Sequence, residues 1–314
     1  MTLESRLRRL LATGDLDIPL PGQGATATRH RRLATIARTD LALARLAEAH
    51  VDAIAILAEA GRRPNQGIYG VWAAETAHLP VYLDHFAEGL FVTGTKMFCT
   101  GAGLIDRALI TVDECLVDVN LRDFSDAITI DQSAWKSSAF AETNTAAVTF
   151  RAMPVAKSDV VGERNWYLKR PGFWHGACGP AACWAGGAMG LYDYAILQSR
   201  DDCHTVAHLA AIKADVWALW AYLDQAGMEI DNNPSDVDEA LVRALTVRHL
   251  IEQAASDILL RVGRAYGPRP LAYDSQVSQR YQEVELYIRQ SHAERDLEVL
   301  GRKIKAAALT PQPA

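Results

Sequence analysis

The side chains that could carry acid–base, thiol or metal chemistry are spread along the chain. No pair of the isolated histidines combines metal-ligand spacing with carboxylates, and this group consists of His175, His204, His208 and His292. The five cysteines are odd in number and contain no CxxC pair, so they indicate neither a disulfide framework nor a zinc site. The sequence therefore predicts no bound metal.

Glu298, in the last predicted helix, is one carboxylate that could transfer a proton. Glu294 and Arg302 lie one turn to either side of it. A carboxylate acts as a general base when a dry pocket raises its pKa. The i, i+4, i+8 spacing around Glu298 is equally typical of a solvated helix face. A role as the base requires that Glu298 faces a closed cavity and that Arg302 turns away from it.

Changes in hydrophobic period indicate the elements that must position these groups. Up to about residue 67 apolar residues recur at threes and fours, which predicts two or three helices. From 68 to about 161 the period is two, which predicts about eight short strands with antiparallel neighbours. After Gly172 four long helices are predicted, over 173–199, 206–230, 235–266 and 278–304.

The predicted fold is α+β with three parts. Residues 1–67 form an N-terminal helical segment, residues 68–165 a central antiparallel β-barrel or sandwich, and residues 166–314 a four-helix bundle. Within the β-domain, Leu90–Thr93 and Met97–Thr100 are extended runs on either side of Thr93-Gly94-Thr95. This pattern predicts a β-hairpin that turns at Gly94.

The stretch Gly89–Ala102 resembles the central β-domain of the acyl-CoA dehydrogenase superfamily. Other segments that resemble the superfamily follow in the superfamily's order, among them Tyr69–Glu75, Arg170–Phe173 and Gly263–Pro268. The resemblance covers nearly the whole chain, and it implies the same three-part fold. The N-terminal helical part is shorter here than is usual in the superfamily.

The resemblance also implies a cofactor, FAD, and its contacts. Trp72, Phe98 and Thr100 occupy positions of motifs that lie against the flavin ring, which needs an apolar wall and a hydroxyl or backbone donor. Further cofactor contacts are implied for the bundle residues Arg200, His208, Gly263 and Gly267. In many members a Glu that follows an Arg by nine positions, as Glu298 follows Arg289 here, removes a proton α to a thioester carbonyl while hydride passes to the flavin.

The resemblance implies the function of a flavin-dependent oxidoreductase. The first candidate reaction is desaturation of an acyl thioester, with electrons passed to a separate acceptor. The Gly-rich loop that follows the strand in many members is replaced by Thr76-Ala77-His78-Leu79-Pro80 after Glu75. Two alternatives therefore stay open. One is a flavin-dependent monooxygenase on the same fold, and the other is a flavin-free binding or structural subunit.

Bulk composition excludes several classes of partner. The chain has 314 residues, of which 49 % are apolar, and this is enough for a large core. A net charge of −6 gives no basic surface for nucleic acid. No apolar run approaches the roughly 20 residues that span a bilayer, and no apolar segment of a signal peptide follows the N-terminus, so we expect a cytoplasmic protein. The bundle helices are apolar on more than one face, which predicts a homodimer or homotetramer.

Overall fold

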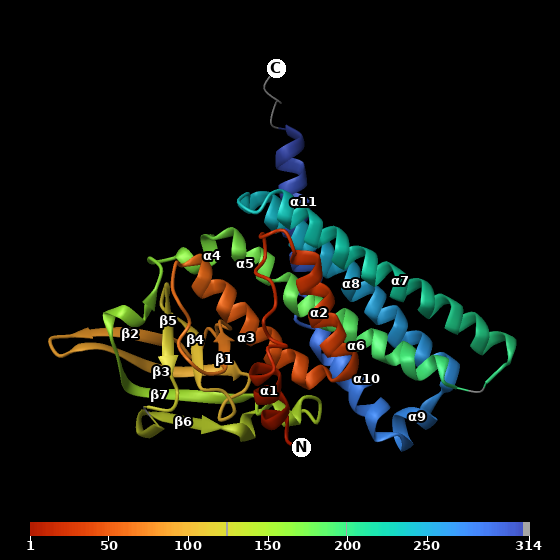
Figure 1. Ribbon diagram of the computed structural model, residues 1–314, viewed down its shortest axis with the longest axis horizontal. Helices are drawn as coiled ribbons and strands as arrows, with labels where there is room; N and C mark the ends of the chain where they lie inside the picture. The colour runs from red at the N-terminus through yellow and green to blue at the C-terminus, as the bar shows by residue number, and fades with distance from the viewer. Residues whose placement is uncertain (124, 199, 310–314) are drawn as a thin grey trace. The chain divides into compact units, whose positions relative to one another are not determined.

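The computed structural model describes residues 1–309 except 124 and 199. Helices, strands and again helices follow one another along the chain, as Figure 1 shows. Two compact units can be distinguished, one made of Met1–Ile18 and Arg45–Phe173 and the other of Pro19–Ala44 and the chain from Trp174 onward. Their boundary falls within α3 (Leu41–Glu59), so the N-terminal helices are divided between the two units. Helix α1 (Leu3–Ala12) belongs to the first unit and α2 (Thr26–Thr39) to the second.

The first unit contains two four-stranded sheets that do not close into a barrel. One sheet has the strand order β1 (Tyr69–Trp72), β4 (Arg107–Val112), β5 (Cys115–Asn120) and β8 (Val160–Val161). The other has the order β2 (Val81–Phe86), β3 (Gly89–Cys99), β7 (Ala146–Val155) and β6 (Ile128–Asp131). The α+β fold class expected from the sequence is confirmed.

The prediction of a hairpin turning at Gly94 is wrong. Strand β3 runs through this residue without a break, and the chain reverses earlier, at Ala87-Glu88, where β2 pairs with β3. Gly94 has φ +132°, and a Cβ there would lie 2.3 Å from the carbonyl oxygen of Pro80. Glycine is required because β2 passes so close to it, whereas the sequence pattern suggested a turn.

One strand pair also departs from the expected antiparallel arrangement. Strands β1 and β4 pair in parallel, with Tyr69 opposite Arg107 and Trp72 opposite Ile110. The β2–β3 hairpin lies between these two strands in the sequence and supplies the long connection that a parallel pair requires. The remaining strand pairs among the described residues are antiparallel.

The second unit is helical, and its long helices are α6 (Cys178–Ile196), α7 (Cys203–Asn232), α8 (Val237–Tyr266) and α10 (Ser275–Ile288). Ser199, where the first predicted bundle helix ends, lies outside the described residues. The last predicted helix, 278–304, is wrong as one element, because the chain breaks between α10 and α11 (Glu294–Leu309). Ala293 has φ +48° at this break, a conformation that cannot continue an α-helix. A short helix, α9 (Pro268–Tyr273), connects α8 to α10.

Helix α6 lies at the centre of this unit and is buried on nearly all its faces. A Cβ on Gly186 would lie 2.1 Å from the carbonyl oxygen of Ala34, so α2 packs directly on the α6 backbone. Trp184 is fully buried. The Tyr287 ring lies edge-on to it, with 6.3 Å between the ring centres, and the Arg248 guanidinium lies 4.6 Å from the centre of the Trp184 ring. Long helices buried on every side form the core of a large bundle.

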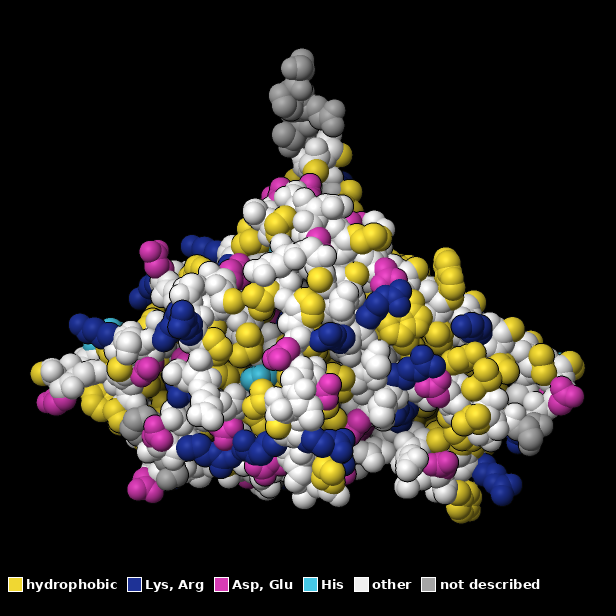
Figure 2. Space-filling view, viewed as in Figure 1, with side chains coloured by type: hydrophobic (Ala, Val, Ile, Leu, Met, Phe, Trp, Pro, Cys, Tyr) yellow, Lys and Arg dark blue, Asp and Glu magenta, His cyan; other side chains and the backbone are white. Residues whose placement is uncertain are grey.

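The outward surface of the second unit is partly apolar. Trp217 on α7 is 71 % exposed, and Figure 2 shows hydrophobic side chains among charged ones over the helices of this unit. Even so, among the residues that the structure describes, no helix is both long and apolar enough to cross a membrane.

Candidate functional site

At the end of β3, the predicted site residue Phe98 has an unusual backbone conformation. Phe98 has φ +59°, which is uncommon for a residue other than glycine, and its side chain is 59 % exposed. The pairing of β3 with β7 shifts register between Lys96 and Cys99, as in a β-bulge. Bulges bend a strand and redirect its side chains, and they are common beside active sites. The bulge therefore presents an aromatic ring to the surface of the first unit.

Trp72 and Thr100 are joined directly. The Trp72 indole Nε1 donates to the carbonyl oxygen of Thr100 at 2.9 Å, and the indole is 2 % exposed. A Cβ on Gly70 would lie 3.2 Å from that nitrogen and 2.6 Å from the Ile105 side chain, so glycine leaves room for the ring. The Thr145 hydroxyl donates to the Thr100 hydroxyl at 3.2 Å. The proton of the Thr100 hydroxyl is thereby available to an acceptor outside this network.

Lys96 is a buried cation that the sequence analysis did not single out. Its ammonium donates to the carbonyl and the hydroxyl of Thr111, at 2.8 and 2.9 Å, and burial lowers the pKa of Lys96. A cavity of about 420 Å³ lies beside it, lined by residues 74–77 and 79–81 and by Lys96, Met97, Thr111 and Asp113. The available signal was that Lys96 is the single charged residue of strand β3. Nearby, burial raises the pKa of Cys99 to about 12, so this thiol stays protonated.

In the second unit, three predicted cofactor residues lie around the end of α8. Arg200 donates to the carbonyl oxygen of Ala265 at 2.9 Å, between Gly263 and Gly267. Gly267, with φ +66°, ends the helix, and its N–H donates to the Gly263 carbonyl at 3.0 Å. The structure thus brings Arg200 and the two glycines together.

His208 lies in the second turn of α7 and has an unsatisfied ring nitrogen. Its Nδ1 is buried and makes no hydrogen bond with any residue that the structure describes. A buried polar atom without a partner is costly, and such an atom commonly marks a position where a ligand or a water binds. This property fits the flavin contact expected of His208.

Glu298 lies on α11, where its side chain is 52 % exposed and forms an ion pair with Arg302. Arg289, the other residue of the expected spacing, belongs to the end of α10 and pairs with Glu252 and Glu285. The break between α10 and α11 thus separates the two positions into different helices. Within the described residues, Glu298 faces solvent beside a cation, and this is the arrangement expected of a solvated helix face.

This chain is similar to known proteins in structure rather than in sequence. No protein-family model matches the sequence, and no curated protein matches it. TdsC from Paenibacillus sp. A11-2, a dibenzothiophene monooxygenase solved with FMN and indole, matches with a TM-score of 0.77 and 16 % identity over 92 % of this chain and 85 % of its own. KijD3, solved with FMN and a dTDP-sugar, matches with a TM-score of 0.76 and 15 % identity over 98 % and 91 %.

A third similar structure is the 3-HSA hydroxylase from Rhodococcus sp. RHA1, with a TM-score of 0.76 and 14 % identity over 98 % of this chain and 91 % of that one. The TM-scores of 0.76 to 0.77 establish similarity of fold, at identities of only 14 to 16 %. The order of helices, sheets and helical bundle described above is shared with these structures. The chain therefore has the acyl-CoA dehydrogenase fold, as the resemblance of its motifs implied.

Proposed function

We propose that this protein is a flavin-dependent oxidoreductase of the monooxygenase type. The observation that carries the proposal is the arrangement at the end of β3, where the Trp72 indole fixes Thr100 and a bulge exposes the ring of Phe98. The unpartnered Nδ1 of His208 supports the same proposal from the second unit. Two proteins of similar fold were solved with FMN, and a third, XiaF, with FADH2.

Each of these residues has a defined part in the proposal. Phe98 would provide an apolar wall for the flavin ring, and the Thr100 hydroxyl would donate to a ring acceptor. In the second unit, His208 and Arg200, with the Gly263–Gly267 segment, would contact the polar part of a flavin. When bound, the flavin supplies two-electron redox chemistry. The protein's own contribution is to bind and orient the ring and to hold a hydroxyl proton beside it.

Oxygenation is favoured over acyl-thioester dehydrogenation because of Glu298. Dehydrogenation needs a carboxylate base in a dry pocket, whereas Glu298 is half exposed and paired with Arg302. The solved structures that are named for their reactions include a monooxygenase and a hydroxylase. An acyl thioester substrate with a separate electron acceptor thus becomes the second candidate, and it rests on the spacing of Arg289 and Glu298.

Flavin binding tests the proposal directly. We expect the purified protein to bind FMN or FAD with saturable quenching of flavin fluorescence, and the chromatographic identity of the flavin that copurifies will show which form is preferred. Anaerobic octanoyl-CoA should leave the visible flavin band unchanged if the enzyme is a monooxygenase. Bleaching of the band would support the dehydrogenase instead, and failure to bind either flavin would favour a flavin-free subunit.

Glu298→Gln provides a second test. Removal of an exposed ion pair changes stability by about 1 kcal/mol or less, and we expect turnover to remain within about fivefold of the unchanged enzyme. The measurement is oxygen-dependent turnover, with reduced flavin, of an aromatic substrate found in a panel that includes indole and dibenzothiophene. Loss of a general base would lower turnover about 10²- to 10⁴-fold, and a drop of that size would restore the base role of Glu298.

A further inference from the structure

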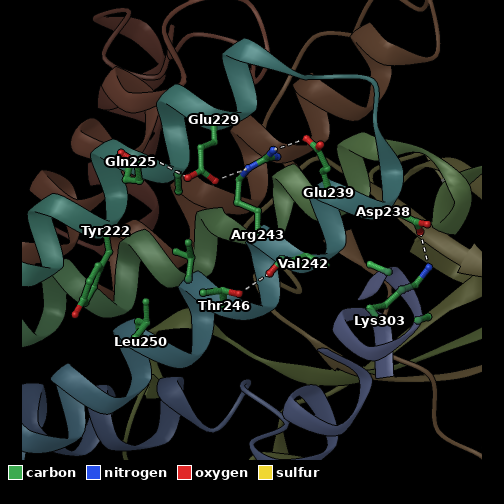
Figure 3. Close-up of a pocket in the computed structure, with 14 residues that line it drawn as sticks. Tyr222, Gln225, Glu229, Asp238, Glu239, Val242, Arg243, Thr246, Leu250 and Lys303 are labelled. Carbon is green, nitrogen blue, oxygen red and sulfur yellow. Dashed lines mark hydrogen bonds and ion pairs between the residues drawn. The ribbon is translucent and has the colours of Figure 1, made fainter. Parts of the chain in front are cut away.

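A second cavity lies entirely within the helical unit, between α7, α8 and α11, and has a volume of about 600 Å³ (Figure 3). None of the residues assigned above to flavin lines it. Cavities of this size hold small organic molecules, and such sites are mostly apolar with a few placed polar groups. The cavity is therefore separate from the residues that the proposed function assigns to flavin.

Most of the cavity wall is apolar. Its apolar lining residues come from three helices and are Ala226, Val242, Val247, Leu250, Ala306 and Ala307. Tyr222 adds an aromatic ring, and its hydroxyl makes no hydrogen bond with the residues that the structure describes. Figure 3 shows Tyr222 and Leu250 together at one end, away from the charged side chains of Glu229, Arg243 and Glu239. A ligand with an extended apolar body fits this division.

The charged residues of the wall are already paired. Arg243 donates from Nε to Glu229 at 3.2 Å and lies 3.8 Å from Glu239, and Lys303 bonds to Asp238 at 2.5 Å. Three carboxylates thus face two cations, which leaves a formal charge of −1 on the wall. An added anion would be repelled by this net negative charge. A neutral ligand avoids this cost.

Arg243 nevertheless has unused hydrogen-bonding capacity. Its side chain is 6 % exposed, and its Nη1 is buried without a hydrogen-bond partner among the described residues. An unsatisfied buried donor on a charged group carries a free-energy cost that an added acceptor removes. Because Glu229 and Glu239 balance the charge of the guanidinium, a neutral oxygen is a sufficient acceptor. Carbonyl and ether oxygens accept hydrogen bonds without adding charge.

We propose that this cavity is a binding site for a neutral, largely apolar molecule with a carbonyl or ether oxygen. The oxygen accepts a hydrogen bond from the Arg243 guanidinium, and the apolar body lies along Val242 and Leu250 toward Tyr222. The site is independent of the flavin, so its test separates from the test of the proposed function.

Nile red, a neutral apolar dye with one carbonyl, is the probe for this site. With FMN and FAD present in excess, we expect saturable binding that raises the fluorescence of the dye. Ala307→Trp should weaken this binding at least about tenfold, because the indole would fill part of the cavity that Ala307 lines. Ala308→Trp is the matched control, since Ala308 is also exposed on α11 but does not line the cavity. Equal binding by both variants, or equal loss in both, would overturn the proposal.

Two further measurements test the chemistry of the ligand. Arg243→Met should weaken dye binding about tenfold or more, because it removes a charged hydrogen-bond donor, and thermal unfolding will show whether the variant remains folded. The ketone 2-undecanone should displace the dye, whereas undecanoate, of equal chain length, should not. Stronger displacement by undecanoate would overturn the neutral-ligand assignment. If Ala307→Trp alters sedimentation and leaves dye binding unchanged, the cavity is part of a subunit interface and the proposal fails.

Discussion

Replacing Thr100 with Val is expected to lower turnover about 10²- to 10³-fold and to leave flavin bound, because loss of one donor to a developing charge has effects of this size. Valine keeps the shape of the side chain and removes the hydroxyl. The Trp72 bond to Thr100 uses the main-chain carbonyl, so the local backbone should be retained. Stopped-flow oxidation of the reduced flavoprotein in the presence of its substrate measures the effect.

Thr95→Val is the matched control for this experiment. Thr95 lies on β3 just before the bulge, whereas Thr100 follows the bulge, and the Thr95 hydroxyl lies 2.9 Å from that of Thr149 across the sheet. We expect the control to keep nearly full turnover. Equal loss in both variants would show that any lost hydroxyl in this sheet damages the enzyme, and full turnover in Thr100→Val would remove the role assigned to Thr100.

Acid is expected to destabilise the protein between about pH 6.5 and pH 4, through two buried histidines. Burial lowers the pKa of His30 and of His50 from 6.5 to about 4. His50 accepts a hydrogen bond at Nδ1 from the Tyr69 N–H, 3.1 Å away, which requires the neutral ring. His30 Nδ1 lies 3.0 Å from the Leu223 carbonyl oxygen within the second unit.

Stability falls as the pH falls because the unfolded chain binds protons at His30 and His50 more readily than the folded chain does. The stability from each neutral ring is fully present above the unfolded pKa of 6.5, and it is lost as the pH falls toward 4, by about 3 kcal/mol for each histidine. Urea unfolding across this range measures the loss. His50→Asn, whose side-chain oxygen can accept from Tyr69, should show a smaller loss than the unchanged protein. An unchanged pH profile would show that His50 does not titrate as described.

Much of the fold could be predicted because hydrophobic period is a local property of the sequence. The helices up to α3, the strands from β1 onward and the bundle after Gly172 follow the expected periods. Gly94 was misinterpreted because a glycine that permits a close strand has the same sequence signature as a glycine that turns a hairpin. No Pro or Gly marks the break at Ala293 in the sequence, because a non-glycine residue adopts the left-handed conformation there.

The candidate site was less accessible to sequence analysis. Trp72, Phe98 and Thr100 were chosen by resemblance to family motifs, and the hydrogen bond that joins Trp72 to Thr100 spans 28 positions of sequence. The cavity beside Arg243 is lined by segments from α7, α8 and α11 that only the packed unit brings together. No local pattern of period or composition marks such a cavity.

The left-handed backbone of Phe98 has a consequence for how this protein could evolve or be engineered. A non-glycine residue in that conformation costs on the order of 1–3 kcal/mol, which the surrounding sheets must offset. In return, the left-handed backbone at the bulge sets the direction in which the Phe98 side chain leaves the strand, so less ordering of the backbone is needed on binding. Selection for thermal stability alone would favour glycine at this position and would remove the preorganised ring. Under the proposed function, stability and flavin affinity are therefore opposed at Phe98, and variants chosen only for a higher melting temperature should lose the proposed contact there.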